Sequence, residues 1–344
     1  MKRSRKIAYW LSVLAALHLA ILAAGFIAPY DAVQQDRNRP FAPPMRIRMV
    51  DASGKFHLRP FVYAQIPREG TFDQYSEDPL VRIPLKFFLA GSRYRFLGVI
   101  PASTHLFGSE TSTINVLGTD GYGRDLLSRI LYGGQYSVLA GLLAASISLF
   151  LGTLLGAASG YFGRWPDAIL MRLAELCLAL PWLYLLFAVR AFLPLLVSPA
   201  KAFFIIVMII GAVGWARPAR LVRGVALSVK ERDFVRAARG FGASHFYLLR
   251  RHVLPQTRNL IFTQAAILVP QFILAEVTLS FLGLGIPEPT PSWGNLLSSL
   301  QQYSVLSSYW WMYLPAAAMV PFFFGYLSLS SALQEAQRPA KIDL

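Results

Sequence analysis

Charged side chains are scarce in this sequence. Asp, Glu, Lys and Arg together make up 15% of its 344 residues, whereas hydrophobic residues make up 55%. A water-soluble domain of this length does not need so much apolar surface, so the composition favours a chain that crosses a membrane several times. Acidic residues are the scarcer kind, 18 against 33 basic ones, and the net charge is +15. Because no nucleic-acid recognition motif accompanies this excess, we attribute it to basic loops that orient a membrane protein, and predict no nucleic-acid partner.

Cysteine, clustered histidine and a phosphate-binding loop are absent or nearly so. The single cysteine, Cys177, lies in an apolar run, excludes an internal disulfide and is expected to be a small buried side chain. The 5 histidines are scattered along the chain and suggest no metal site. The sequence contains no G-x-x-x-x-G-K-[ST] loop, nucleophile elbow or paired carboxylates. It therefore predicts neither an enzyme nor a bound cofactor.

Long apolar runs are what the sequence does have. Six of them are candidate membrane-spanning helices, and they cover about 8–28, 135–160, 168–189, 202–216, 259–283 and 310–331. Basic residues precede the first run and fill the segment between the fourth and the fifth, which places both on the cytoplasmic side. Six spans then return the C-terminus to the cytoplasm. The fold prediction is an all-α membrane protein with both termini cytoplasmic.

The same runs divide the chain into segments. Residues 1–30 are expected to form the cytoplasmic N-terminus and first span, 31–134 an extracytoplasmic segment, 135–335 a five-helix core, and 336–344 a cytoplasmic tail. The extracytoplasmic segment contains a small β-containing insert, with two strands around a turn at Asp51–Gly54 and a second hairpin around Gly91–Ser92.

Glycines recur at four-residue spacing in the second run, at Gly152, Gly156 and Gly160. They lie on one face of a helix and allow another helix to approach closely. Such an approach is expected both in a transport bundle and in ordinary helix packing.

A basic, amphipathic stretch, 228–255, interrupts the apolar runs. Ser228 and Glu231 have the spacing of a capping box, Gly240 and Gly242 are expected to end the first helix, and Pro255 to end a second one. Alanines on the first helix leave room for close docking. Two interpretations stay open: a hairpin that lies on the membrane surface, or a docking element for a cytoplasmic protein. Because the chain has no phosphate loop, a driven transporter would take ATP hydrolysis from another chain.

Several ordered motifs within about 115–335 resemble permease subunits of ABC importers of the dipeptide/oligopeptide (binding-protein-dependent) family. NVLGTDGYGRDLLSRILYGGQYSVLAG (115–141) is similar to the family's LGTD-x-x-GRD signature, and ILAEVTLSFLGLGIPEPTPSWGNLL (273–297) is similar to a later segment. DFVRAARGFGASHFYLLRRHVLPQ (233–256) resembles the EAA loop, with Arg236 where the usual pattern has Glu. The insert over about 31–114 is longer than in the usual member.

The resemblance implies a type I-like permease fold with six transmembrane helices in the bacterial cytoplasmic (inner) membrane. It also implies ATP-driven import of di- or oligopeptides or similar small solutes. The partners would be a second permease subunit, two ABC ATPase subunits that carry ATP and Mg²⁺, and an extracytoplasmic solute-binding protein. The residues expected to couple to the ATPases are Arg236, Ala237, Ala238, Gly242, His252, Leu254 and Pro255. The matching signature residues are Gly118, Thr119, Asp120, Gly123, Arg124 and Asp125.

Charged residues near the apolar runs have two interpretations each. Glu175 and Glu276 are acids at membrane depth, which line a transport path or bond to a neighbouring helix. Arg190 either extends to the membrane surface or meets an anionic group on the substrate. Asp120 is expected to cap the turn at Gly121–Gly123, while Arg124 or Arg129 pairs with Asp125. That segment is either a rigid lead into the helix or a surface that receives the binding protein.

Two other functional classes stay open at this point. A proton-driven secondary transporter would need titratable groups in series across the bundle, and the sequence shows two separate acids and no inverted repeat. A membrane-anchored receptor would bind its ligand through the insert.

Overall fold

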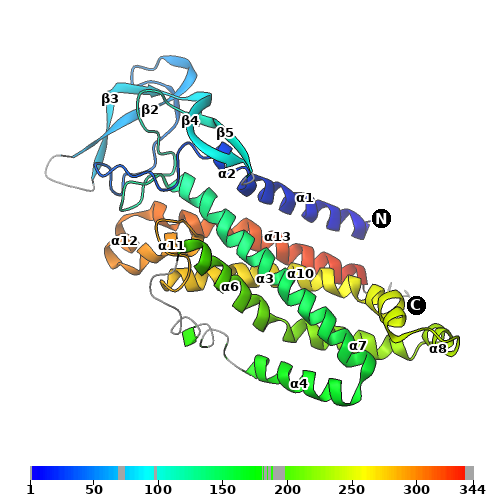
Figure 1. Cartoon of the computed structure of the whole chain (residues 1–344). Helices are drawn as coiled ribbons and strands as arrows, with labels where there is room; N and C mark the ends of the chain where they lie inside the picture. Colours follow the sequence, from blue (N-terminus) through cyan, green and yellow to red (C-terminus); the bar gives the residue numbers. More distant parts are fainter. Residues whose placement is uncertain are drawn as a thin grey trace, which may run out of the picture. The chain divides into compact units, whose positions relative to one another are not determined.

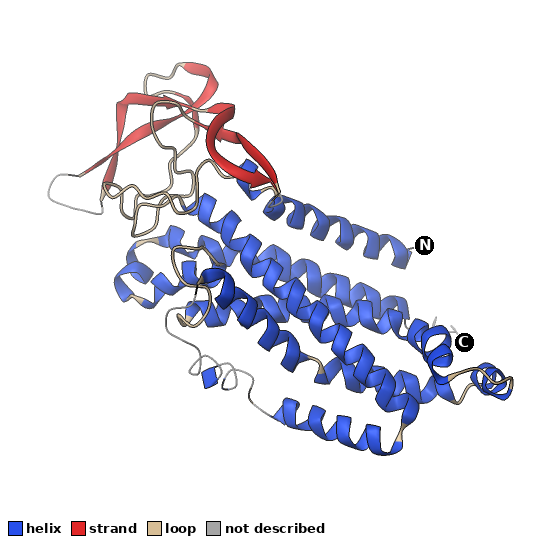
Figure 2. Cartoon of the chain, in the orientation of Figure 1, coloured by secondary structure: helices blue, strands red, loops and turns tan. Residues whose placement is uncertain are grey.

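The computed structural model describes residues 2–68, 74–96, 99–179, 181, 184, 187–188 and 198–337. The described chain is mostly helical, and its named strands lie between residues 48 and 108 (Figure 2). It divides into two compact units. The first comprises Met1–Leu14, Val138–Glu276 and Phe322–Leu344, and the second comprises Ala15–Ser137 and Val277–Pro321.

The helices follow one another in the order shown in Figure 1. They are α1 (Lys2–Leu22), α2 (Ala24–Ile27), α3 (Leu126–Phe162), α4 (Arg164–Ala179), α6 (Pro199–Gly214), α7 (Ala216–Lys230), α8 (Asp233–Gly240), α9 (His245–Leu248), α10 (Leu254–Phe281), α11 (Trp293–Ser298), α12 (Tyr303–Ser308) and α13 (Leu314–Gln337). A π-helical segment, η1 (Leu249–Val253), joins α9 to α10, and two 3-10 turns, η2 (Ser299–Gln301) and η3 (Trp310–Tyr313), flank α12.

Five helices in the described part of the chain are long and apolar enough to cross a membrane. They are Ser4–Leu22, Leu126–Phe162, Phe203–Lys230, His245–Phe281 and Trp310–Gln337. They coincide with five of the six predicted spans, and with the small β insert they confirm the predicted fold class. The remaining prediction, 168–189, falls partly outside the described residues, and α4 covers its first half. Arg190 also lies outside the described residues.

Two of these helices extend beyond the predicted spans. Helix α3 begins at Leu126 rather than near 135, because the Asp125 carboxylate accepts hydrogen bonds from the backbone N–H and the hydroxyl of Ser128 at 2.8 and 2.6 Å. Helix α7 follows α6 with only Trp215 between them. The arginines of α7 therefore continue a helix, whereas the sequence pattern had ended the fourth span at 216.

The glycine series of α3 faces α7. A Cβ atom on Gly156 would overlap the carbonyl oxygen of Ala219, and one on Gly160 would lie 2.6 Å from the carbonyl oxygen of Arg223. A Cβ atom on Gly152 would lie 2.6 Å from Cβ of Pro218. The predicted close approach of a second helix is confirmed, and that helix is α7.

The insert consists of two antiparallel sheets. Strands β1 (Arg48–Val50), β2 (Phe56–Pro67) and β3 (Tyr75–Pro84) form one sheet in that order, and β4 (Lys86–Phe96) pairs with β5 (Ile100–Gly108) in the other. A cluster of buried apolar side chains packs around the three-stranded sheet: Met45, Val62, Ile83, Leu85 and Ile114. The predicted hairpin at Asp51–Gly54 is confirmed, since the Asp51 carboxylate accepts from the backbone N–H groups of Ser53 and Lys55.

The second predicted hairpin is wrong. Gly91 and Ser92 lie inside β4, which continues to Phe96 before the chain returns as β5. The glycine serves close packing instead of a turn, because a Cβ atom on Gly91 would lie 2.6 Å from the ring of His105. That ring is buried, and its Nδ1 lies 2.6 Å from the carbonyl oxygen of Ala28.

Replacing Gly156 with leucine is expected to separate α3 from α7, because the added side chain meets backbone. We expect a loss of about 1–3 kcal/mol or more, seen as a lower melting temperature of the detergent-solubilised chain. Gly224→Ala is the matched control, since no atom lies within 4 Å of its added Cβ atom. The control should be neutral or gain up to about 1 kcal/mol. Equal melting temperatures for Gly156→Leu and wild type would contradict the packing argument.

Candidate functional sites: a basic hairpin and a buried arginine pair

The basic hairpin, residues 228–255, is assembled from the end of α7, from α8, α9 and η1, and from the start of α10. The predicted capping box is wrong: Ser228 lies inside α7, and the N-cap of α8 is Arg232, in extended backbone. The reason is that α7 continues to Lys230 before the chain turns. Glu231 instead pairs with Arg236 at 2.7 Å, which lowers the pKa of the Glu231 carboxyl.

Glycine ends the first helix of the hairpin, as predicted. Helix α8 stops at Gly240, and Gly242 adopts a φ of +85°, in the left-handed region that favours glycine. The N–H of Gly242 donates to the carbonyl oxygen of Arg239 at 3.0 Å. Ser244 then caps α9 by accepting from the backbone N–H of Tyr247. The two glycines thus make the turn between the helices.

The second helix does not end at Pro255. Helical backbone runs from α9 through η1 into α10, and Leu254 and Pro255 are the first residues of α10. Pro255 lies directly after the π-helical segment η1, where the regular hydrogen bonding of the α-helix is already interrupted. The basic hairpin is therefore continuous with a long apolar helix, which the proline had appeared to separate from it.

A small apolar cluster anchors the hairpin. Its buried members come from four elements and η1: Tyr161 of α3, Ala226 and Val229 of α7, Val235 of α8, Leu248 of α9, and Val253 of η1. The sequence reasoning missed Val235, Leu248 and Val253. Only their apolar character marked them, in a stretch whose other features are charge and glycine.

The opposite face of the hairpin is exposed and carries aromatic as well as basic side chains. Phe241 is 92% exposed and Phe246 is 72% exposed. Arg236 and Ala237 are exposed too, whereas Ala238 packs partly against the apolar cluster. Exposed aromatic side chains of this kind occur at surfaces that bind a protein or a membrane, so both interpretations of the hairpin stay open at this point.

His252 packs against two aromatic rings of the hairpin, and its expected part in coupling stays a prediction. Its ring lies 5.6 Å from the ring of Phe234 and 5.8 Å from that of Tyr247. It therefore links α8 to α9.

Polar contacts fasten the hairpin to the C-terminal end of α3. Lys230 Nζ donates to the carbonyl oxygen of Gly160 at 3.0 Å, and Tyr161 Oη lies 2.8 Å from Nδ1 of His245. The Arg239 guanidinium lies over the Tyr161 ring. Cationic groups are favourable at a helix C-terminus, where carbonyl groups lack partners and the helix dipole is negative. The hairpin and the end of α3 are thus linked by both polar and apolar contacts.

A bidentate ion pair adds α4 to the same end of α3 and α7. Arg223 Nε and Nη2 donate to the two carboxylate oxygens of Asp167 at 2.5 and 2.6 Å, and the Ser159 hydroxyl donates to the same carboxylate. These hydrogen bonds, those from Arg223 above all, lower the pKa of Asp167.

The acids proposed for a transport path lie in different environments. Glu175 is exposed on α4 and pairs with Arg172 of the same helix at 3.2 Å. Glu276 is fully buried in α10. The structure does not bring Glu175 into the interior of this chain, and a role for either acid in a path stays a prediction.

The predicted signature residues form a tight turn before α3. The Asp120 carboxylate accepts from the backbone N–H groups of Tyr122 and Arg124 at 2.9 and 3.0 Å, which confirms its predicted capping role. Gly118 and Gly123 have positive φ values of 80° and 71°. A Cβ atom on Gly123 would overlap the carbonyl oxygen of Asp36, so this turn requires glycine. Thr119 is buried, and its hydroxyl donates to the carbonyl oxygen of Arg39.

Asp125 pairs with neither arginine, contrary to prediction. Besides capping α3 through Ser128, it accepts from the side-chain amide of Asn115 at 3.0 Å. Burial raises the pKa of Asp125, against the effect of these hydrogen bonds. The two arginines pair instead with Asp120 and with a second acid, which is distant in sequence.

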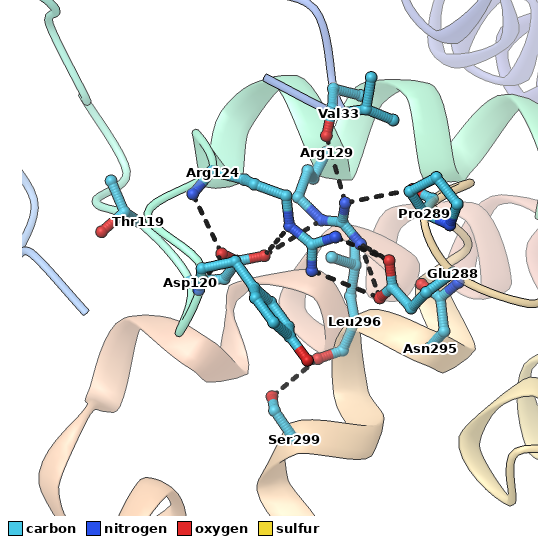
Figure 3. A network of polar contacts seen from close by, with 12 residues as sticks. Val33, Thr119, Asp120, Arg124, Arg129, Glu288, Pro289, Asn295, Leu296 and Ser299 are labelled. Atoms are coloured by element: carbon cyan, nitrogen blue, oxygen red, sulfur yellow. Dashed lines mark hydrogen bonds and ion pairs between the residues drawn. The ribbon is translucent and has the colours of Figure 1, made fainter. Parts of the chain in front are cut away.

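That acid is Glu288, which follows α10. Arg124 Nε donates to Asp120 at 2.7 Å, while its Nη1 donates to Glu288 at 2.7 Å (Figure 3). Arg129 Nη2 donates to Glu288 at 2.9 Å, and its Nε lies 3.4 Å from Asp120. The two guanidinium groups thus lie between two carboxylates. Burial lowers the pKa of Arg124, but the two carboxylates outweigh this and raise it.

Sequence reasoning missed Glu288. Its signal is an acid between two prolines in a stretch otherwise rich in glycine and apolar residues, P-E-P at 287–289. Beside the pair lies a cavity of about 390 Å³, lined by Glu288 and both arginines and by residues of α11, η2 and α12.

The chain is similar to known proteins over more than half of its length. Residues 152–339 match the model of a family described as "Binding-protein-dependent transport system inner membrane component". The dipeptide transport system permease protein of Bacillus subtilis is 36% identical over 240 residues, which cover 70% of each chain. The oligopeptide transport system permease protein of Haemophilus influenzae is 38% identical over 223 residues, 64% of this chain and 69% of that protein. A Brucella suis relative is 38% identical over 204 residues, 59% of this chain and 66% of its own length, so the chain spans just under two thirds of that relative.

Removing the Asp167 charge should destabilise the first unit in a pH-dependent way. The pKa of Asp167 is lower in the folded chain than in the unfolded chain. The ion pair therefore stabilises the folded chain fully at pH values above the unfolded pKa. This stabilisation is lost as the pH falls through the folded pKa. We expect Asp167→Asn to cost about 1–3 kcal/mol at neutral pH. The difference from wild type should begin to shrink below about pH 4, the ordinary pKa, and should vanish only below the lower pKa of the folded chain.

Thermal unfolding across this pH range checks the prediction. Glu175→Gln is the control, because its ion pair with Arg172 is exposed and on the same helix, and it should change stability little at any pH. A loss for Asp167→Asn that persists unchanged at low pH would rule out the charge as its cause.

Proposed function

Because the chain belongs to the family of binding-protein-dependent transport system inner membrane components, we propose that it is the permease subunit of an ATP-driven importer. The observation that carries the proposal is the basic hairpin. It combines exposed aromatic side chains with a buried anchor to α3 and α7, and its backbone continues into the long apolar helix α10. An ion-coupled secondary transporter and an anchored receptor are not favoured by this family.

The proposed partners supply what the sequence lacks. Two ABC ATPase subunits would bind ATP and Mg²⁺ on the cytoplasmic side and receive the hairpin, which requires both termini of this chain to be cytoplasmic. A second permease subunit would complete the transport path, and an extracytoplasmic binding protein would deliver the solute. Glu175, Glu276 and Arg190 are the proposed path residues of this chain.

The hairpin can transmit a push because its contacts lead in two directions. Phe241, Phe246, Arg236 and Ala237 would meet the ATPase directly, with Gly242 shaping the turn between them. Backbone continuity through η1 carries displacement into α10 by way of Leu254 and Pro255.

The second direction is into α3. Lys230 and His245 hold its C-terminal end, and the glycine face of α3 keeps it against α7. ATPase closure would therefore move α3, α7 and α10 together, opening the path outward, and hydrolysis would return them.

The proposed cargo is a peptide or a similar small solute. Two relatives are named as dipeptide and oligopeptide permeases. The binding protein, as a separate chain, would make most of the selection among such solutes.

Replacing the exposed aromatic side chains should release the ATPase. We expect Phe241→Asp with Phe246→Asp to reduce co-purification of a phosphate-loop ATPase with the tagged chain by about tenfold or more, since buried aromatic anchors dominate interface energies. Mass spectrometry of the complex from native membranes, in mild detergent, measures the loss. Phe56→Asp with Phe87→Asp, at exposed positions of β2 and β4 outside the membrane-spanning helices, is the control and should retain the ATPase. Wild type that brings down no nucleotide-binding chain would refute the importer assignment.

Gly242→Pro should abolish ATP-driven uptake while leaving membrane insertion intact. Proline cannot adopt the φ of +85° found there, and it removes the N–H that bonds to Arg239. No atom lies within 4 Å of a Cβ atom added at this position, so we expect the rest of the unit to persist. The readout is uptake of a labelled dipeptide in the native host. The control is Gly240→Ala, because Gly240 is the last residue of α8 and does not have a positive φ. Normal uptake by the proline variant would exclude the turn from coupling.

A further inference from the structure

The buried arginine pair holds a carboxylate that is itself accessible. The Arg124 and Arg129 side chains are 5% and 0% exposed, whereas that of Glu288 is 43% exposed. Both guanidinium groups donate to the Glu288 carboxylate, at 2.7 and 2.9 Å (Figure 3). Two planar cations that converge on one carboxylate form a typical carboxylate-recognition arrangement.

Charge balance requires this position to stay filled. Asp120 and Glu288 together neutralise the two arginines. Without Glu288, the site would hold one net positive charge on guanidinium groups that water barely reaches, and an uncompensated buried charge is strongly destabilising. Glu288 can therefore leave only when another anion takes its place.

The structure provides room for such an exchange. The cavity of about 390 Å³ is bounded by both arginines and Glu288, and this volume lies in the range of roughly 300–1,000 Å³ found for small-molecule sites. One wall is apolar and includes Leu296, Val305 and Met312. A carboxylate with a small apolar group attached fits this combination of lining residues.

Glu288 can move without unfolding its loop. The Asn295 side-chain amide donates to the carbonyl oxygens of Ile286 and Thr290, at 3.3 and 2.7 Å. These bonds fix the loop on both sides of Glu288. Displacement then breaks the contacts of one carboxylate while the loop stays in place.

We propose that Arg124 and Arg129 form a carboxylate-binding clamp, which Glu288 occupies in this structure and which a carboxylate of another molecule occupies in exchange. The two sources of that group are the C-terminus of a peptide and an acidic side chain of a protein partner. The clamp itself is independent of the transport proposal, but the choice of a peptide as its source rests on it.

Chemical rescue tests the clamp on the full chain in detergent. Glu288→Ala should lower the melting temperature by on the order of 5 °C or more. Sodium acetate at about 0.1 M should then restore at least half of the loss, whereas sodium chloride at the same ionic strength should not. Glu110→Ala is the matched control, because Glu110 forms an exposed ion pair with Lys86 in the same unit. It should show no preference for acetate.

A second variant covers the outcome in which Glu288→Ala does not fold. Glu288→Gln keeps the shape of the side chain without its charge, and acetate should stabilise it more than chloride does. Equal effects of acetate and chloride on the folded variants would overturn the clamp.

Two ligands distinguish the sources of the carboxylate. Alanyl-alanine that rescues at a lower concentration than N-acetyl-aspartate amide would assign the clamp to a peptide C-terminus, with alanyl-alanine amide as the control that lacks the carboxylate. The reverse order would assign it to an acidic side chain. Because no ATPase or uptake enters these measurements, failure of the importer assignment would leave their outcome unchanged.

Discussion

The close approach of α3 and α7 is the contact on which the rest of the first unit depends. Gly156 brings the backbone of one helix against that of the other at Ala219, and no larger residue fits there. Aligned in this way, the two helices bring Arg223 to Asp167 and Lys230 to the C-terminal end of α3. The apolar cluster under the basic hairpin then includes side chains from both helices. One steric constraint thus positions the ion pair, the helix cap and the base of the hairpin.

The hairpin shows how a short segment can be held firmly and still present a docking surface. Its buried residues are few, and its exposed face carries Phe241 and Phe246 next to arginines. Rigid attachment matters for the proposed coupling, because a flexible element would absorb a push instead of passing it to α3 and α10. Arg236 stands where the related loop pattern has Glu, and here it bonds to Glu231 of the same hairpin. The positive charge of Arg236 is thereby compensated by an acid of the same hairpin.

In the second unit, two arginines, Arg124 and Arg129, lie where water is nearly excluded. Asp120 comes from the same turn as Arg124, but it neutralises only one of the two cations. Glu288, contributed from beyond α10, supplies the second charge. A site of this kind is stable only while it is filled, which is why a structural ion pair can also serve as a binding site.

Composition and apolar runs were enough to determine the membrane class, the approximate positions of most spans and the presence of a β insert, because these depend on hydrophobicity and short-range periodicity. Short-range hydrogen bonding also made the Asp120 turn and the glycine turn at Gly242 predictable. The partners of charged side chains were not predictable in this way. Arg129 and Asp125 are close in sequence, yet Arg129 pairs with Glu288 and Asp125 caps α3. Likewise, Gly91 packs against His105 instead of making a turn, and Pro255 lies within a continuous helical stretch instead of ending a helix. Each of these outcomes depends on which distant residue the fold brings close, and only the tertiary structure decides that.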